Sequence, residues 1–254
     1  MLLGWGSDAF NQAKDDSIDL QEIKSQLPSK IHYEYANHKL YSGDHSLTFK
    51  KWKPWDQWDY PAQDLIRFKH LLLDNVDIIK NKTIIDFACF LGFTSFSCLH
   101  LGASHVTATN IIKHQLDIAD ELMQSAEFTD YKLILADIHD TESNTKICNK
   151  VDTVILAGIM YHLHDHYRVL ESILSAQPDN IIIDPPRAGI HNNVIDHLLE
   201  LEVPKITYVS CNPTTMARDC ELLSAKYDII KIKPVDMFPQ TYHIEAIAQL
   251  RLKK

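Results

Sequence analysis

The chain has 254 residues, 45% of them hydrophobic, and its formal net charge at pH 7 is -9. This length and composition fit one globular domain whose core needs no disulfide or metal to hold it together. The negative charge excludes a protein that coats nucleic acid non-specifically, because such proteins need a concentrated positive surface. Any contact with RNA must therefore come from a local patch.

The cysteines and the start of the chain bear on the compartment. The five cysteines are odd in number and form no Cys-x-x-Cys pair, so neither a disulfide framework nor a zinc or iron–sulfur site is indicated. The first residues lack the basic region of a leader, and no apolar run approaches the roughly 20 residues that cross a bilayer. We expect a soluble protein of the reducing cytoplasm, with no membrane segment.

The N-terminal part differs in texture from the rest. Residues 1–65 hold all four tryptophans, three of them beside Lys50, Lys51 and Lys53. The segment 49–58 either stacks unpaired bases, as single-strand binders do, or packs as a lid, because tryptophan is usually buried. We therefore expect an appendage or lid over residues 1–65, ahead of a main domain over residues 66–254.

From about Asn81 short β-branched runs alternate with longer amphipathic stretches, which is typical of βαβ units and a parallel sheet. The predicted strands are Thr83–Phe87, His105–Asn110, Lys132–Ala136, Val151–Ala157, Asn180–Asp184 and Ile206–Ser210. The helices predicted between them include Lys113–Ser125, Tyr167–Ser175, Asn193–Leu201 and Met216–Lys226. Two further strand-like runs, Asp228–Asp236 and His243–Leu252, predict a terminal antiparallel hairpin. The expected fold is an α/β sheet, mostly parallel and closed by that hairpin.

Polar residues collect where the predicted strands end. Ligands of open α/β sheets bind beyond the carboxyl ends of the strands. The last strand runs the other way, so its first residues reach the same rim. An aspartate after a strand is, taken alone, more often a cap or a turn residue, so the inference rests on the residues that occur there together: Asp86, Asn110, Asp137, Asp184, Cys211, His243 and Glu245.

The first of these strands leads into Asp86-Phe87-Ala88-Cys89-Phe90-Leu91-Gly92. With Ile84 and Ile85 it resembles the first motif of the class I S-adenosylmethionine methyltransferases, usually Asp-x-Gly-x-Gly-x-Gly after two hydrophobic residues. The resemblance implies a Rossmann-like sheet, S-adenosylmethionine as cofactor, and a cofactor half over residues 81–180. Phe90 stands where a glycine is common, and Asn110 where an acid usually accepts the ribose hydroxyls. The implied cofactor-binding residues are Asp86, Ala88, Gly92, Asn110 and Asp137.

A second stretch, 151–163, resembles the fourth-strand region of many small-molecule and tRNA-modifying methyltransferases, whose Tyr-His-Leu ending faces the substrate. This likeness implies a substrate-binding role for His162. Together with His164, Asp165 and His166, it also offers residue types that bind zinc or iron. Histidines that alternate in a loop are more often solvated or capping, so we predict no metal.

Three segments of the last third share one further resemblance. Asp184-Pro-Pro-Arg-Ala-Gly189, the Ser-Cys-Asn-Pro-containing run 208–219, and the run 236–245 resemble, in this order, the RNA (uracil-5-)-methyltransferase family. The resemblance covers residues 181–254. It implies that Cys211 is the nucleophile, that Glu245 is the base, and that Asp184 helps to position the uracil. The partner implied is RNA, either tRNA or rRNA.

The chemistry explains these residue types. C5 of uracil is a weak nucleophile, so a thiolate first adds to C6, and a base later removes the C5 proton. Cys211 lies between a strand end and a helix predicted to start near Thr214, a setting expected to lower a thiol pKa. Arg187 and Arg218 either meet phosphate or cap helices, and the first is the candidate for substrate binding. The other cysteines are expected to pack or to lie on the surface.

The two halves do not join as the uracil enzymes would lead one to expect. In that family the Asp-Pro-Pro-Arg strand is itself the fourth, whereas here the run 151–163 precedes it. Residues 151–175 are therefore an added βα unit, a peripheral excursion, or a sign that segments of two methyltransferase branches are joined. The first functional hypothesis is 5-methyluridine formation in tRNA or rRNA. The second is methylation of a small molecule or another tRNA position near Tyr161 and His162, and the third is a non-catalytic cofactor- or RNA-binding module.

Overall fold

The computed structural model describes residues 37–39, 46–48, 68–235 and 244–254. The first two segments are the strands β1 (Asn37–Lys39) and β2 (Ser46–Thr48), which pair antiparallel. Most of the expected appendage, including the tryptophan-rich segment, lies outside the described residues, as does His243. The boundary expected near residue 65 lies there too.

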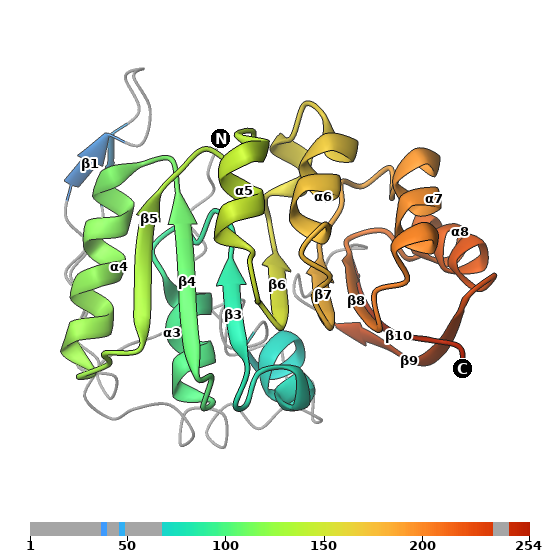
Figure 1. The fold of residues 1–254 in the computed structure, drawn as a ribbon, viewed down its shortest axis with the longest axis horizontal. Helices are drawn as coiled ribbons and strands as arrows, with labels where there is room; N and C mark the ends of the chain where they lie inside the picture. The colour runs from blue at the N-terminus through green and yellow to red at the C-terminus, as the bar shows by residue number, and fades with distance from the viewer. Residues whose placement is uncertain (1–36, 40–45, 49–67, 236–243) are drawn as a thin grey trace.

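One eight-stranded sheet forms the centre of the described chain (Figure 1). The strand order is β5-β4-β3-β6-β7-β8-β10-β9. The first six strands in this order run parallel, while β10 is antiparallel to both β8 and β9. This confirms the mostly parallel sheet with a terminal antiparallel hairpin. The strands are β3 (Thr83–Asp86), β4 (His105–Asn110), β5 (Tyr131–Leu135), β6 (Thr153–Leu156), β7 (Asn180–Ile183), β8 (Lys205–Ser210), β9 (Tyr227–Val235) and β10 (Glu245–Leu252).

Helices cover both faces of this sheet. The π-helix η2 (Phe68–Leu72), the 3-10 helix η3 (Leu73–Ile78), α3 (Phe93–His100) and α4 (Lys113–Ser125) contribute to one core cluster. The other face carries α5 (Thr141–Ile147), α6 (His166–Leu174), α7 (Asn192–Leu201) and α8 (Pro213–Leu223), with the 3-10 turn η4 (Met160–His162) before α6. Within the described residues, no helix is long and apolar enough to cross a membrane.

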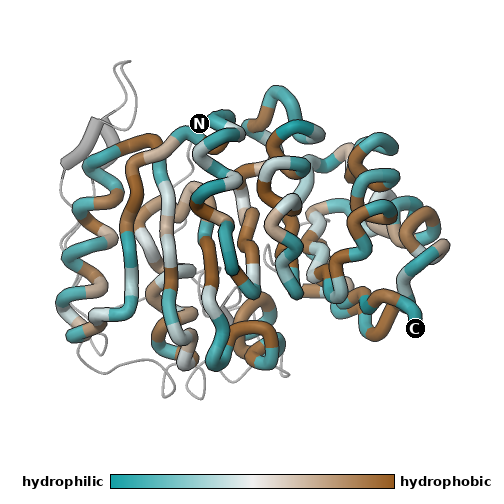
Figure 2. Tube along the Cα trace, in the orientation of Figure 1, coloured by the Kyte–Doolittle hydropathy of each residue, from teal (hydrophilic) through white to brown (hydrophobic). Residues whose placement is uncertain are grey.

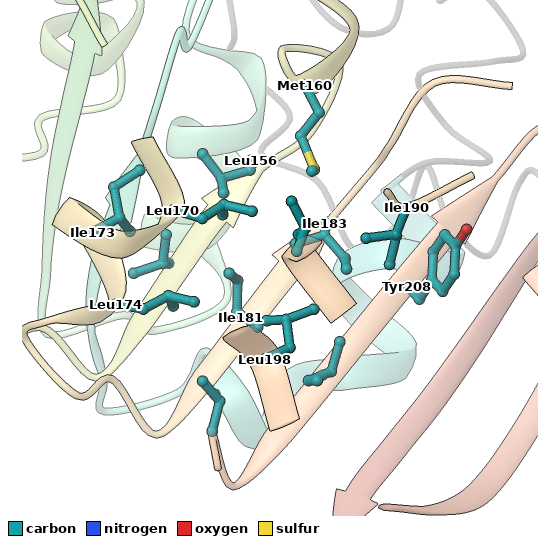
Figure 3. Close-up of a cluster of buried hydrophobic side chains, with 14 of the residues drawn as sticks. Leu156, Met160, Leu170, Ile173, Leu174, Ile181, Ile183, Ile190, Leu198 and Tyr208 are labelled. Carbon is teal, nitrogen blue, oxygen red and sulfur yellow. The ribbon is translucent and has the colours of Figure 1, made fainter. Parts of the chain in front are cut away.

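The core follows from uninterrupted apolar strands. Every residue of β6 and β7 is buried, as expected of parallel strands covered on both faces. Figure 2 shows hydrophobic residues along these central strands and alternating hydropathy along α4. Figure 3 shows Leu156, Ile181 and Ile183 of the two strands beside Leu170 of α6 and Leu198 of α7.

The run around residues 151–175 is an added βα unit. Strand β6 pairs with β3 on one side and with β7 on the other, and α6 follows it. Of the three alternatives, the structure agrees with an added βα unit and rules out a peripheral excursion, because β6 pairs with a strand on each side. Adjacent strands are about 4.8 Å apart, so β3 and β8 are separated by three spacings, or about 14 Å.

The η3 turn ties the C-terminal strands to the rest of this face. The Gln249 side chain of β10 donates to Asn75 Oδ1 at 2.6 Å, and Lys233 of β9 pairs with Asp74 at 3.2 Å. Asn75 in turn donates to the backbone carbonyl of Leu71 at 3.0 Å. The η3 segment, which precedes β3, therefore anchors the β9–β10 hairpin.

Candidate active site

A cavity lies beyond the carboxyl end of β3. Its walls come from η2, the loop after β3, the start of α3 and the end of β6, and its lining includes Leu71, Asp86, Ala88, Phe90 and Ala157. Two of the five residues predicted to bind the cofactor, Asp86 and Ala88, therefore line one cavity. Gly92 stands two residues beyond Phe90, as the residue that caps α3.

The loop after β3 keeps a backbone of glycine type. Ala88, Phe90 and Gly92 have φ values of 55°, 52° and 84°. These alternate positions are those that glycine occupies in the resembled motif, so the backbone persists where two of the side chains have changed. A Cβ at Gly92 would overlap the Ala119 side chain of α4, which explains why this position alone still requires glycine.

Substituting Ala88 with glycine is expected to stabilise the protein. A left-handed backbone costs a residue with a Cβ about 1–2 kcal/mol, while glycine loses about 0.5–1 kcal/mol more backbone entropy on folding. We expect the free energy of unfolding to rise by roughly 0.5–1 kcal/mol in urea denaturation. The matched substitution Ala108→Gly, in buried β4, is expected to lower it. A loss of stability in Ala88→Gly would show that the loop does not hold this conformation.

Asp86 is a buried carboxyl group at the edge of the cavity. It is 3% exposed and accepts a hydrogen bond of 2.6 Å from the Ser95 hydroxyl. Burial raises the pKa of Asp86 to about 7, and the hydrogen bonds from Ser95 only partly oppose this. A cationic group bound beside Asp86 would favour its ionised form.

The free energy of unfolding is expected to fall as the pH rises from about 4 to about 7, because of Asp86. Its pKa is raised from 3.8 to about 7 in the folded state, so the folded protein binds more protons than the unfolded chain in this window. The shift corresponds to at most roughly 4 kcal/mol. Asp86→Asn keeps an acceptor for Ser95 and removes the titration, so its free energy of unfolding should depend less on pH. Urea denaturation at pH 5, 6, 7 and 8 measures this, with Asp137→Asn as control, and parallel pH curves for Asp86→Asn and the parent protein would contradict it.

Asn110 is the last residue of β4, and Asp137 lies two residues after the end of β5. The Asn110 side chain is buried and bonded to α4 and to the loop before it: it donates to Gln115 Oε1 at 2.8 Å and accepts from Ile112 N–H at 3.0 Å. Asp137 is exposed and accepts hydrogen bonds from the backbone and ring of His139, which lower its pKa. Neither residue lines the cavity, and their cofactor roles stay predictions.

Cys211, Glu245 and Asp184 come together at the other end of the rim. Ala246 of β10 pairs with Ser210 of β8, so one further step in this register sets Glu245 opposite Cys211. The charges of Glu245 and Asp184 both act on the Cys211 thiol, as does that of Arg187. Three strands that are distant in sequence therefore deliver the thiol and the two carboxylates to one place.

The expected lowering of the Cys211 pKa is wrong for this arrangement. Cys211 does precede a helix: Asn212 caps α8 through a 3.2 Å bond from Thr214 N–H. Burial nevertheless raises the pKa of Cys211, and the negative charges of Glu245 and Asp184 raise it further, against a smaller opposing effect of Arg187. Cys211 is half-buried, whereas the other four cysteines are buried.

The remaining predicted residues have diverse settings. Arg187 is exposed. Arg218 donates to the carbonyl of Ala188 at 3.0 Å and pairs with Asp219, and a contact with phosphate stays a prediction. His162 is exposed in η4, where its ring lies 4.3 Å from that of Tyr161. Among the described residues no group of three potential metal ligands is found.

The loop after β6 lies between the cavity and the cysteine. Ala157 lines the cavity, and the next residue, Gly158, donates its N–H to Asp184 Oδ2 at 3.1 Å. A Cβ at Gly158 would lie 3.8 Å from the Tyr161 hydroxyl. The sequence motifs did not single out Gly158, although its position after a predicted strand placed it at the rim.

Comparisons with known proteins identify a family and relatives of this chain. The family model described as tRNA (Uracil-5-)-methyltransferase matches residues 5–253. A protein of Bacteroides thetaiotaomicron named as an uncharacterized RNA methyltransferase is 41% identical over 116 residues, which are 46% of this chain and 25% of that protein. A similarly named protein of Staphylococcus aureus is 30% identical over 209 residues, 82% of this chain and 40% of that protein. The chain thus spans two fifths or less of the length of these relatives.

The solved structures that resemble this fold include the following two. The Pyrococcus abyssi tRNA (uracil-54, C5)-methyltransferase in complex with S-adenosyl-L-homocysteine is 22% identical and has a TM-score of 0.47. The match covers 85% of this chain and 44% of the Pyrococcus abyssi chain. The N-methyltransferase NodS of Bradyrhizobium japonicum, in complex with the same compound, is 14% identical with a TM-score of 0.47. The match covers 79% of this chain and 92% of the NodS chain.

Proposed function

The chain belongs to the tRNA (uracil-5-)-methyltransferase family, and from this premise we propose that it methylates C5 of uridine in tRNA or rRNA, with Cys211 as nucleophile. The observation that carries the proposal is the convergence of Cys211, Glu245 and Asp184 from β8, β10 and the end of β7. A thiol beside two carboxylates provides both a nucleophile and a base.

The cavity beyond β3 suits S-adenosylmethionine as methyl donor. Left-handed backbone at Ala88, Phe90 and Gly92 lets the chain approach a ligand closely, and the first N–H groups of α3 can meet a carboxylate. The buried Asp86 suits the cationic groups of the cofactor. When bound, the cofactor supplies an electrophilic methyl group.

The protein groups then act in a defined order. The Cys211 thiolate forms a bond to C6 of uracil, and the electron pair of the C5–C6 double bond makes C5 nucleophilic. After C5 has taken the methyl group, Glu245 removes the C5 proton, the double bond re-forms, and the Cys211 thiolate leaves. Because the pKa of Cys211 is raised in the protein alone, this mechanism needs the Cys211 proton to be removed as the uracil docks. Asp184 is the carboxylate that can accept it, since Glu245 must stay unprotonated to take the C5 proton later.

The added strand supports a second candidate. Strand β6 lies between β3 and β7, so the loop of Gly158 and Tyr161 is closer to the cavity than Cys211 is. A base stacked on Tyr161, which is 56% exposed, would be methylated at an atom that needs no covalent activation. This alternative keeps the methyl donor and the RNA substrate class but leaves Cys211 without a role in the reaction.

Product analysis separates the candidates. Unmodified tRNA and rRNA are incubated with the protein and methyl-labelled S-adenosylmethionine, digested to nucleosides and analysed by mass spectrometry. Label in 5-methyluridine, lost in Cys211→Ala, supports the first candidate. Label in another nucleoside, lost in Tyr161→Ala but kept in Cys211→Ala, supports the second. No label in any nucleoside would overturn both.

A further inference from the structure

A fully buried carboxylate lies behind the cysteine. Asp219 of α8 is 0% exposed. It accepts hydrogen bonds from the Tyr208 hydroxyl and from Ile190 N–H, each at 2.7 Å, and pairs with Arg218, whose Nε is 2.9 Å away. Buried carboxylates are retained where such partners fix them. None of the three partners belongs to the set of reacting groups proposed above.

The ion pair clamps the loop that follows β7. Arg218 donates to the backbone carbonyls of Ala188 at 3.0 Å and Ile190 at 3.4 Å. Between them, Gly189 has a φ of 84°, and a Cβ there would overlap the Asp219 carboxylate and the Arg218 guanidinium. The loop therefore lies directly on α8, with no room for a side chain in between.

The same loop is bonded to the turn that follows Cys211. The backbone carbonyl of Arg187 accepts hydrogen bonds from Asn212 Nδ2 and Thr215 Oγ1, both at 3.2 Å. Asn212 directly follows Cys211 and caps α8. Figure 3 shows the Tyr208 ring beside Ile190, where β8 meets this loop. Two sets of bonds thus join the loop to the turn of the candidate nucleophile.

We propose that Asp219 is a positioning residue: through Arg218 and Ile190 it holds the loop so that the Arg187 guanidinium stays close to the Cys211 sulfur. The importance of this for catalysis rests on the proposed function, but the positioning itself is a property of the protein without RNA. The charged groups that act on Cys211 are Glu245, Asp184 and Arg187. Of these, Arg187 lies on the clamped part of the loop.

Alkylation of Cys211 by iodoacetamide, without RNA, tests the proposal. Cys211 is half-buried while the other cysteines are buried, and the alkylated residue is identified by peptide mass spectrometry. Thiolate is the reacting form, so losing the positive charge of Arg187 should slow the reaction. We expect Arg187→Gln and Asp219→Asn each to lower the rate at pH 7.5 by about three-fold, as the loss of one nearby charge does. The double variant should be no slower than Arg187→Gln alone, because both changes remove the same contact.

Multiplying effects, with the double variant about nine-fold slower, would overturn the proposal, as would an unchanged rate in Asp219→Asn. Should Asp219→Asn fail to fold, Tyr208→Phe takes its place in the comparison of the two single variants with the double variant. This substitution removes one hydrogen bond to Asp219 and keeps the shape of the Tyr208 ring. Tyr227→Phe is the matched control, because that buried tyrosine of β9 bonds to the carbonyls of Leu198 and Val203 instead. Absence of 5-methyluridine in the product analysis would refute the proposed function and leave this result unaffected.

Discussion

Cys211→Ala is expected to form no covalent complex with RNA that contains 5-fluorouridine, whereas the parent protein is trapped on it. Fluorine at C5 cannot leave as a proton, so the bond between Cys211 and C6 persists after methyl transfer. Methylation of ordinary RNA should also fall by at least about 10³-fold, as for enzymes that lose their nucleophile. The complex is measured as a band of reduced mobility in denaturing gels and as a modified peptide by mass spectrometry.

The matched control is Cys220→Ala. Cys220 lies in the same strand–helix unit, in α8, but is 2% exposed, and burial raises its pKa to about 11. It should form the complex as the parent protein does. A complex that persists in Cys211→Ala would refute the uridine mechanism, and a complex lost in both variants would point to a disturbed α8 in place of a missing nucleophile.

Glu245→Gln should have the second large effect, with a different signature. The glutamine keeps the shape of Glu245 but cannot take the C5 proton, so turnover should fall by roughly 10²–10⁴-fold. The methylated base then remains bonded to Cys211, and a covalent complex should accumulate even on ordinary uridine. The same gel assay with unmodified RNA measures it.

A second readout separates loss of the base from general damage. The negative charge of Glu245 contributes to the raised pKa of Cys211, so Glu245→Gln should lower that pKa and speed the alkylation of Cys211 at neutral pH. Asp228→Asn, an exposed carboxylate on the same hairpin, should change neither assay. Normal turnover in Glu245→Gln would exclude it as the base, while slower alkylation would contradict its placement opposite Cys211.

Local hydrophobic pattern was enough to predict most of the fold. The continuous apolar run in β7 and the amphipathic period of α4 depend on neighbours in sequence, and the latter helix has its predicted bounds, Lys113–Ser125. The rule that ligands meet the carboxyl ends of strands also placed Asp86, Asp184 and Cys211 at one rim. Such features need no knowledge of which strands are neighbours.

Tertiary structure decided the rest, because it depends on contacts between distant segments. Sequence could not tell whether the predicted strand Val151–Ala157 enters the sheet, since strand pairing is a long-range choice. The position of β6 between β3 and β7 sets the distance from the cavity to Cys211. The helix predicted a low pKa for Cys211, but burial, together with the carboxylates brought to it from two other strands, raises that pKa. Phe90 stands where a glycine is common, yet its φ of 52° shows that the folded loop has a glycine-like backbone at this position.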